Sequence, residues 1–298
     1  MAYDFALVDV FSDRPFGGNQ LAVFPDAEGI GEQTMQQLAR EFNFSETTFV
    51  LPPRDPTRSF RIRIFTPNQE LPFAGHPTVG TAAVLAGSGP SRQTFVFEEG
   101  VGPVTVTVEG GLIRLHLQDP VYESTDEAPP ATAVARALTL PEDAIVDSWY
   151  AGIGLRFCFI RLAGPELVDQ ARLDRAAWEA GIAERWSPHL YVFAGDLRDG
   201  AHVYSRFFAP AVGVHEDPAT GSAAASLVAG LARRSPGRHG TYRLRISQGV
   251  AMGRPSTLQG TAHKENGLLT QVVVGGNAVV VGSGTMDLPA EAVRRPTP

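Results

Sequence analysis

The stretch that decides the fold is Glu216-Asp217-Pro218-Ala219-Thr220-Gly221-Ser222-Ala223-Ala224-Ala225-Ser226-Leu227, which predicts the start of a buried helix over 218–233. We expect Asp217 to cap this helix by accepting a hydrogen bond from a backbone N–H. Pro218 fits the first turn, where a missing N–H costs nothing. The residues that follow are apolar on nearly every face, so other structure should enclose the helix. Its N-terminus suits an anion because the free N–H groups carry a partial positive charge.

A second stretch, residues 75–85, resembles the first. An alignment on the prolines produces three further pairs: His76 with Asp217, Gly80 with Gly221, and Thr81 with Ser222. Two preceding segments repeat as well, residues 63–67 against 206–210 and residues 18–24 against 154–160. The chain is therefore predicted to consist of two equivalent halves, with the N-termini of their buried helices facing each other across a cleft.

Strand patterns outnumber helices in both halves. The helices expected from apolar spacing lie at 30–42, 77–87, 173–180 and 218–233. Residues 1–122 form the first half and residues 131–278 the second, and a polar, proline-bearing linker at 123–130 joins them. The strands at about 279–298 are an exception that could pair with the first half. This pattern predicts an α+β fold in which a mixed sheet wraps around a central helix, twice.

Composition excludes several classes of protein. A net charge of −7 and a pI near 5.5 argue against a nucleic-acid binder, which would show a basic stripe. No apolar run approaches the ~20 residues of a membrane span, and no signal peptide is visible, so we expect a cytoplasmic protein without membrane contact. Cys158 is the only cysteine and Lys264 the only lysine. This excludes a catalytic thiol pair and argues against Schiff-base chemistry.

No cofactor is expected. The chain has neither a GxGxxG nor a P-loop pattern, which removes support for a nucleotide cofactor. The run at 215–217 contains a histidine and two carboxylates, but adjacent side chains do not converge easily on one ion. We therefore expect no metal site.

Glu46 lies at a helix-to-strand junction with apolar neighbours. It is either a surface charge at a strand edge or a partly desolvated group with a raised pKa, as a general acid/base requires. Taken alone, Asp217 is a helix cap, and His76 is a cap or a buried core histidine. Together with Glu46, the two helix starts would bring carboxylates and an imidazole, which can carry protons, close to free backbone N–H groups that can bind an anion.

Small residues at the helix starts are candidates for substrate binding. Ser222 and Thr81 could donate hydroxyls to a ligand. Gly80 and Gly221 either let a ligand approach the backbone or only allow close helix packing. We include Asn19, the first residue of a predicted strand that follows a glycine-rich turn, among the expected substrate contacts.

Five segments resemble the PhzF-like family of phenazine biosynthesis, whose relatives include diaminopimelate epimerase. They are residues 9–11 with 17–24, residues 44–50, residues 66–78, residues 217–222 and residues 253–255. The resemblance implies a diaminopimelate-epimerase-like fold and a homodimer. It also implies that Glu46 moves the proton in a pocket lined by His76, Asp217 and Ser222. The epimerase relatives use a cysteine at each helix start, where we expect His76 and Asp217 in this chain.

The resulting hypothesis is a cofactor-independent isomerase that moves a proton within a small unsaturated or cyclic carboxylic acid. The resemblance implies chemistry of the trans-2,3-dihydro-3-hydroxyanthranilate isomerase type. Two alternatives stay open. One is an epimerase or racemase with two opposed bases and no catalytic cysteine, and the other is a binding protein that kept the pocket and lost the chemistry. In each case the partner is a small anionic carboxylic acid.

Overall fold

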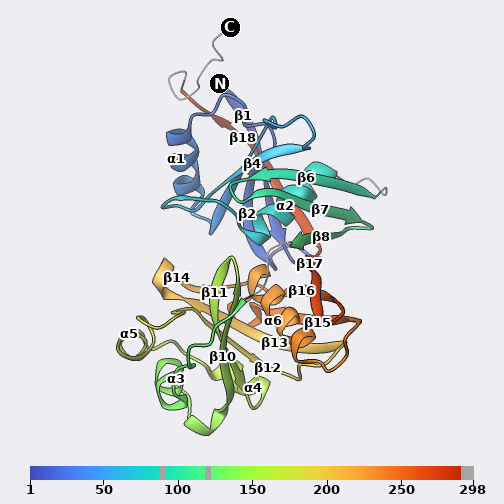
Figure 1. Ribbon diagram of the computed structural model, residues 1–298. Helices are drawn as coiled ribbons and strands as arrows, with labels where there is room; N and C mark the ends of the chain where they lie inside the picture. Colours follow the sequence, from blue (N-terminus) through green and yellow to red (C-terminus); the bar gives the residue numbers. More distant parts are fainter. Residues whose placement is uncertain (88–91, 118–121, 290–298) are drawn as a thin grey trace. The chain divides into compact units, whose positions relative to one another are not determined.

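The computed structural model describes residues 1–87, 92–117 and 122–289 (Figure 1). The chain divides into two compact units. The first unit contains Met1–Leu117 and the segment that begins at Gly275, and the second contains Gln118–Val274. Each unit is built as a mixed sheet around one central helix.

The first unit is a mixed sheet. Its strands are β1 (Ala2–Val10), β2 (Asn19–Phe24), β3 (Glu46–Leu51), β4 (Phe60–Phe65), β5 (Glu70–Leu71), β6 (Gln93–Glu99), β7 (Gly102–Glu109), β8 (Leu112–Leu117) and β18 (Ala278–Asp287). The pairings β2–β3 and β4–β6 are parallel, and β1–β2, β3–β4, β4–β5, β6–β7 and β7–β8 are antiparallel. The last strand returns to this unit, where β18 pairs antiparallel with β1.

Helix α2 (Gly75–Ala86) is the central helix of the first unit and packs against β1, β2, β3, β7, β8 and β18 (Figure 1). Its small residues allow this close approach. A Cβ at Gly80 would lie 2.6 Å from Cδ2 of Leu21 and 2.7 Å from Cγ2 of Val10. Helix α1 (Glu32–Phe42) packs on β3 and β4, where Met35 and Leu38 join a cluster of buried phenylalanines.

The second unit repeats the mixed sheet. Its strands are β9 (Tyr122–Glu123), β10 (Ile145–Ile153), β11 (Leu155–Leu162), β12 (Leu190–Ala194), β13 (Ala201–Ala209), β14 (Val214–Asp217), β15 (Gly240–Gln248) and β16 (Ser256–Glu265), followed by β17 (Leu268–Gly276). Its helices are α3 (Ala131–Leu138), α4 (Pro165–Gln170), α5 (Arg175–Gly181) and α6 (Gly221–Arg234), with short 3-10 turns at Glu142–Ala144, Pro210–Val212 and Val250–Met252. Helix α6 is the central helix and packs against β10, β11, β15 and β16.

The two units share one pattern of strand pairing. In the second unit, β10–β11, β12–β13, β13–β14 and β15–β16 are antiparallel, and β11–β12 and β13–β15 are parallel. The first unit has the same directions in β1–β2, β3–β4, β4–β5, β6–β7, β2–β3 and β4–β6. The sheets and their central helices therefore correspond strand by strand, as the repeat in the sequence predicts.

The four expected helices are present, with ends displaced by a few residues. Two helices were missed, α3 and α4, and so were the short strands β5, β9 and β14. The expected linker begins within β9, which pairs with β10. These elements have two to eight residues, which is too short for hydrophobic periodicity to distinguish them from loops.

Candidate active site

Glu46 and His76 meet at the start of α2. Glu46 is the first residue of β3, and His76 is the second residue of α2. Oε2 of Glu46 lies 3.4 Å from Nε2 of His76, and their side chains are 16% and 7% exposed. Of the two interpretations of Glu46, the geometry favours the partly desolvated group over a surface charge, because most of its side chain is removed from water.

Burial keeps His76 neutral. Desolvation lowers the pKa of His76 to about 3, although a hydrogen bond to the backbone of Gln20 opposes this shift. Nε2 has no hydrogen-bond partner within the described residues, so we assign the bond to Gln20 to the other ring nitrogen, Nδ1. A neutral ring that donates from Nδ1 presents the lone pair of Nε2 to Glu46. The pair can therefore hold one proton between a carboxyl group and an imidazole.

The remaining expected contacts of the first unit are buried in its core. Asn19 is the first residue of β2 and is 1% exposed. Thr81 is fully buried within α2, and Gly80 permits the packing of α2 on β1 and β2. For Gly80 the structure thus supports the interpretation of close helix packing. Substrate contacts for Asn19 and Thr81 stay predictions.

Asp217 does not cap the helix, contrary to our expectation. It is the last residue of β14, and α6 begins four residues later at Gly221, with Thr220 at the N-cap. Oδ2 of Asp217 accepts a hydrogen bond of 2.6 Å from the hydroxyl of Thr220. Pro218 lies in the connection rather than in the first turn. The pairing of Asp217 with Phe207 of β13 extends the strand to this residue and delays the helix.

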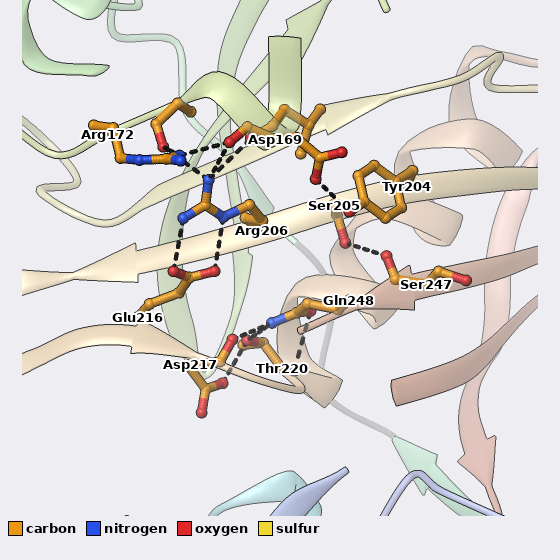
Figure 2. Close-up of polar contacts among 12 residues, drawn as sticks. Asp169, Arg172, Tyr204, Ser205, Arg206, Glu216, Asp217, Thr220, Ser247 and Gln248 are labelled. Atoms are coloured by element: carbon orange, nitrogen blue, oxygen red, sulfur yellow. Dashed lines mark hydrogen bonds and ion pairs between the residues drawn. The ribbon is translucent and has the colours of Figure 1, made fainter. Parts of the chain in front are cut away.

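Gln248 joins the polar groups at the start of α6 (Figure 2). It is fully buried at the end of β15. Its Nε2 donates to the carbonyl of Asp217 (2.8 Å) and to Oγ1 of Thr220 (2.9 Å). Its Oε1 accepts from the backbone N–H of Thr220 (3.3 Å) and from the hydroxyl of Tyr191 (3.4 Å). Gln248 therefore positions both the Asp217 backbone and the helix start.

A buried ion pair holds β14 beside this network. Arg206 and Glu216 form two hydrogen bonds of 2.8 Å, and their side chains are 7% and 9% exposed. Nη1 of Arg206 also donates to the carbonyls of Val168, Asp169 and Ala171 around the end of α4 (Figure 2). In the sequence, Arg206 stands out only as the counterpart of Arg63 in the repeat. Its ion-pair partner Glu216 could not be predicted from the sequence, because it lies ten residues away on another strand.

The strand ladders correct the alignment of the two helix starts. Ile64 pairs with Leu71 in the first unit, and its counterpart Phe207 pairs with Asp217 in the second. Both helices then begin four residues after these positions, at Gly75 and Gly221. His76 therefore corresponds to Ser222, and Asp217 corresponds to Leu71. The expected equivalence of His76 and Asp217 is wrong by five residues.

The corrected register also reveals His189. Leu21 pairs with Glu46, and the parallel pairing of Cys158 with Leu190 places His189 at the equivalent position of the second unit. Burial lowers the pKa of His189 to about 4, and its Nδ1 has no hydrogen-bond partner in the described part of the chain. No sequence motif singles this histidine out. Only the ladder relates it to Glu46.

Ser222 and Gly221 occupy the first turn of α6. Gly221 is buried and Ser222 is half-buried, so the serine keeps part of its surface accessible. The described side chains contain no group of three or more His, Cys, Asp and Glu residues arranged to hold a metal ion. None of the helices in the described segments has the length and apolar character needed to cross a bilayer.

Comparison with known proteins identifies the family. A family model described as phenazine biosynthesis-like protein matches residues 8–284. The chain belongs to this family. An uncharacterized isomerase (mll1393) of Mesorhizobium japonicum is 38% identical over 95% of this chain and 98% of its own length. The trans-2,3-dihydro-3-hydroxyanthranilate isomerase of Pseudomonas chlororaphis is 36% identical over 96% of this chain and all of its own length.

A solved structure extends the family likeness to the fold. The PhzF family protein of Bacillus anthracis superposes with a TM-score of 0.83, covering 97% of this chain and all of that chain at 21% identity. The expected diaminopimelate-epimerase-like α+β fold is confirmed. The relatives from Mesorhizobium japonicum and Pseudomonas are named as isomerases, and the chain is an isomerase of the PhzF-like family.

Proposed function

We propose that this isomerase moves a proton within a small unsaturated or cyclic carboxylic acid, without a cofactor. Support comes from three Pseudomonas relatives that are named trans-2,3-dihydro-3-hydroxyanthranilate isomerase. One observation carries the proposal: the carboxylate of Glu46 lies 3.4 Å from a buried, neutral imidazole at the start of a central helix. A carboxylate beside a neutral base can accept a proton, hold it and return it.

The proposed reaction begins when a carboxylate oxygen of Glu46 takes a proton from an activated carbon of the substrate. The electrons of the broken C–H bond enter the conjugated system and shift its double bond. The carboxyl group of Glu46 then donates the same proton to another carbon of that system, which regenerates the carboxylate. Over the whole cycle the number of protons and the charge are unchanged, and nothing is oxidised or reduced.

His76 stabilises the intermediate state in this scheme. While Glu46 carries the proton, Nε2 of His76 can accept a hydrogen bond from the carboxyl group. The low pKa of the imidazole prevents it from keeping the proton itself. Substrate contacts by Asp217 and Ser222 remain part of the proposal, on the strength of the family resemblance.

The test is Glu46→Gln, assayed with trans-2,3-dihydro-3-hydroxyanthranilate and related unsaturated cyclic acids. The amide keeps the shape of the carboxylate and cannot accept the proton, so turnover should fall by about 100-fold or more. Glu41→Gln is the matched control, because it removes the same charge from an exposed position on α1. Equal turnover of Glu46→Gln and the parent enzyme would refute the role of Glu46.

A second candidate reaction is epimerisation by two proton carriers. The observation in its favour is His189, a buried neutral imidazole that stands in the second unit where Glu46 stands in the first. Turnover in deuterated water separates the two reactions. Epimerisation predicts inversion at the carbon that gains deuterium, whereas isomerisation predicts a displaced double bond.

A further inference from the structure

The proposed mechanism makes no use of the buried carboxyl group of Glu99. Glu99 is the last residue of β6 and is 7% exposed. Its Oε1 lies 2.9 Å from Oγ1 of Thr78, a fully buried residue of α2, and its Oε2 has no hydrogen-bond partner within the described residues. Burial raises the pKa of Glu99 to about 8, although the bond with Thr78 opposes this shift. Glu99 is therefore mostly neutral at pH 7.

The cationic neighbours of Glu99 lie on the other face of the sheet. The titratable groups on the elements around it are His76 of α2, Arg61 and Arg63 of β4, Glu98 of β6 and Glu109 of β7. Arg61 pairs with Glu98 in the ladder between β4 and β6, and Arg63 shares their face. Glu99 follows Glu98 and therefore points to the opposite face, toward α2. The carboxylate of β7 stands at the far end of that strand, and His76 is neutral.

The hydroxyl of Thr78 lies between two acceptors. Its Oγ1 is 2.8 Å from the carbonyl oxygen of Ala74 and 2.9 Å from Oε1 of Glu99. A hydroxyl has one proton to donate and two lone pairs that accept. A neutral Glu99 removes the competition, because its carboxyl group donates to Oγ1 of Thr78 while Thr78 donates to Ala74. Glu99, Thr78 and Ala74 then form a relay of two hydrogen bonds.

This relay ends at the start of the helix that carries His76. Ala74 is the N-cap of α2 and precedes His76 by two residues. The backbone N–H of Thr78 donates to the same carbonyl over a long distance of 3.3 Å, so the shorter bond from the hydroxyl fixes this turn more firmly. The turn holds Nε2 of His76 at 3.4 Å from Oε2 of Glu46. A displacement of the turn therefore changes this distance.

The second unit has a permanently neutral group at the same position. The ladders place Gln248 at the position of Glu99, and Thr220 is the N-cap of α6 as Ala74 is of α2. Gln248 donates to the hydroxyl of Thr220 and accepts from its backbone N–H (Figure 2). In both units the end of a strand is thus tied to the N-cap of the central helix. In the first unit, loss of a proton can break this tie.

We propose that neutral Glu99 is a positioning residue, which fixes the first turn of α2 through the hydroxyl of Thr78 and thereby places His76. When Glu99 is ionised, its carboxylate accepts a charge-assisted hydrogen bond from Thr78, whose proton then turns away from Ala74. The first turn of α2 moves, and His76 moves with it. The effect on turnover rests on the proposed function of Glu46 and His76, whereas the movement of His76 does not.

The first test follows the imidazole resonances of His76 in the free protein between about pH 6 and 10. His76 itself titrates at about pH 3, so its own protonation contributes nothing in this range. In the wild type, we expect these resonances to shift with a midpoint at about pH 8. Glu99→Gln should show no such shift, because the amide donates to Thr78 at every pH. Glu98→Gln is the matched control, since it removes the adjacent carboxylate on the opposite face and should keep the shift.

Two variants of Thr78 show whether the effect passes through the relay. Thr78→Val has a similar shape and no hydroxyl, so ionisation of Glu99 should no longer shift the His76 resonances. Thr78→Ser keeps the hydroxyl and should keep the shift. Absence of the shift in the wild type, or its full persistence in Thr78→Val, would overturn the proposal. Circular dichroism shows whether each variant is folded, and Glu99→Gln tests the proposal even if Thr78→Val does not fold.

The second test measures kcat and KM of the isomerase against pH. Relative to Glu99→Gln, the kcat of the wild type should fall by about fivefold as the pH rises through 8, the effect of losing one hydrogen bond. KM should change by less than about twofold, because Glu99 acts through Thr78 and not on the substrate. A flat ratio of kcat values would refute the positioning role in turnover. If Glu46→Gln left turnover unchanged, the proposed function would fail instead, and the His76 resonances would still decide whether the relay exists.

Discussion

The starts of the two central helices have the same backbone plan and differ in how completely their polar groups are bonded. Both helices begin at a glycine three residues after a proline, Pro72 in one unit and Pro218 in the other. In the second unit, Gln248 hydrogen-bonds through both its oxygen and its nitrogen. The pairing of β4 with β6 and of β13 with β15 places Glu99 of the first unit at the position of Gln248. Within the described residues, the side chain of Glu99 bonds only to Thr78, and Nε2 of His76 has no hydrogen bond.

This difference suits the start of α6 to a rigid support and the start of α2 to a reactive site. Buried polar groups in native structures are usually hydrogen-bonded, and each exception calls for an explanation. A network with all its bonds made fixes side chains in one arrangement. A neutral imidazole beside a carboxylate, by contrast, leaves a lone pair available to a proton. This contrast supports the proposal that Glu46 and His76 of the first unit transfer the proton, while the hydrogen-bonded start of α6 provides fixed geometry.

The largest expected effect comes from the two equivalent ion pairs. Arg206→Met leaves Glu216 buried without its partner and should lower the free energy of unfolding by about 3–5 kcal/mol. Arg63→Met should cost about 1 kcal/mol, because Glu32 and Glu70 are 72% and 39% exposed and regain water. Urea unfolding measures both, and the three tryptophans, all in the second unit, report on Arg206→Met by fluorescence. Equal losses of unfolding free energy would show that the two ion pairs contribute equally to stability, contrary to this prediction.

The next comparison concerns the residues at the ends of β15 and β6. Gln248→Leu leaves the N–H of Thr220 and the carbonyl of Asp217 without partners, so it should destabilise the protein by about 2–3 kcal/mol. Glu99→Gln keeps a neutral group of the same shape and should change stability by less than about 1 kcal/mol. Amide hydrogen exchange at Thr220 provides a local readout, since its N–H should exchange faster only in Gln248→Leu. Unchanged protection there would contradict the positioning role of Gln248.

The smallest effect is a dependence of stability on pH. The pKa of His76 is about 3 in the folded protein and 6.5 in the unfolded chain, so the unfolded chain binds more protons between these values. Stability must therefore fall as the pH falls below 6.5, by up to about 1.4 kcal/mol per pH unit from this group. The stability difference between the wild type and His76→Gln should change by about 2 kcal/mol between pH 6.5 and 5, in favour of the variant.

Glu99 gives the first unit a dependence of opposite sign. Its folded pKa of about 8 lies above the ordinary value of 4.5, so its contribution is complete below 4.5 and is lost as the pH rises through 8. Measuring His76→Gln against the wild type cancels this contribution. Unfolding followed by far-ultraviolet circular dichroism at each pH provides the data, and a constant difference would show that His76 is not buried as a neutral group.

The sequence by itself determined the α+β class, the four principal helices and the repeat. These depend on local patterns: runs of small apolar residues produce buried helices, and alternation produces strands. The candidate residues Glu46 and His76 were also readable, because they lie in segments that resemble the PhzF-like family. What these patterns lack is any measure of distance between segments.

The tertiary structure alone decided the register of the repeat and the partners of its polar residues. An alignment on prolines placed Asp217 opposite His76, whereas the strand ladder extends β14 to Asp217 and leaves Ser222 in the equivalent place. Gln248 became the hub of a network because β15 brings it to a loop that is 28–31 residues earlier in the chain. Hydrogen bonds between strands set such positions, and they join residues whose separation in sequence carries no signal.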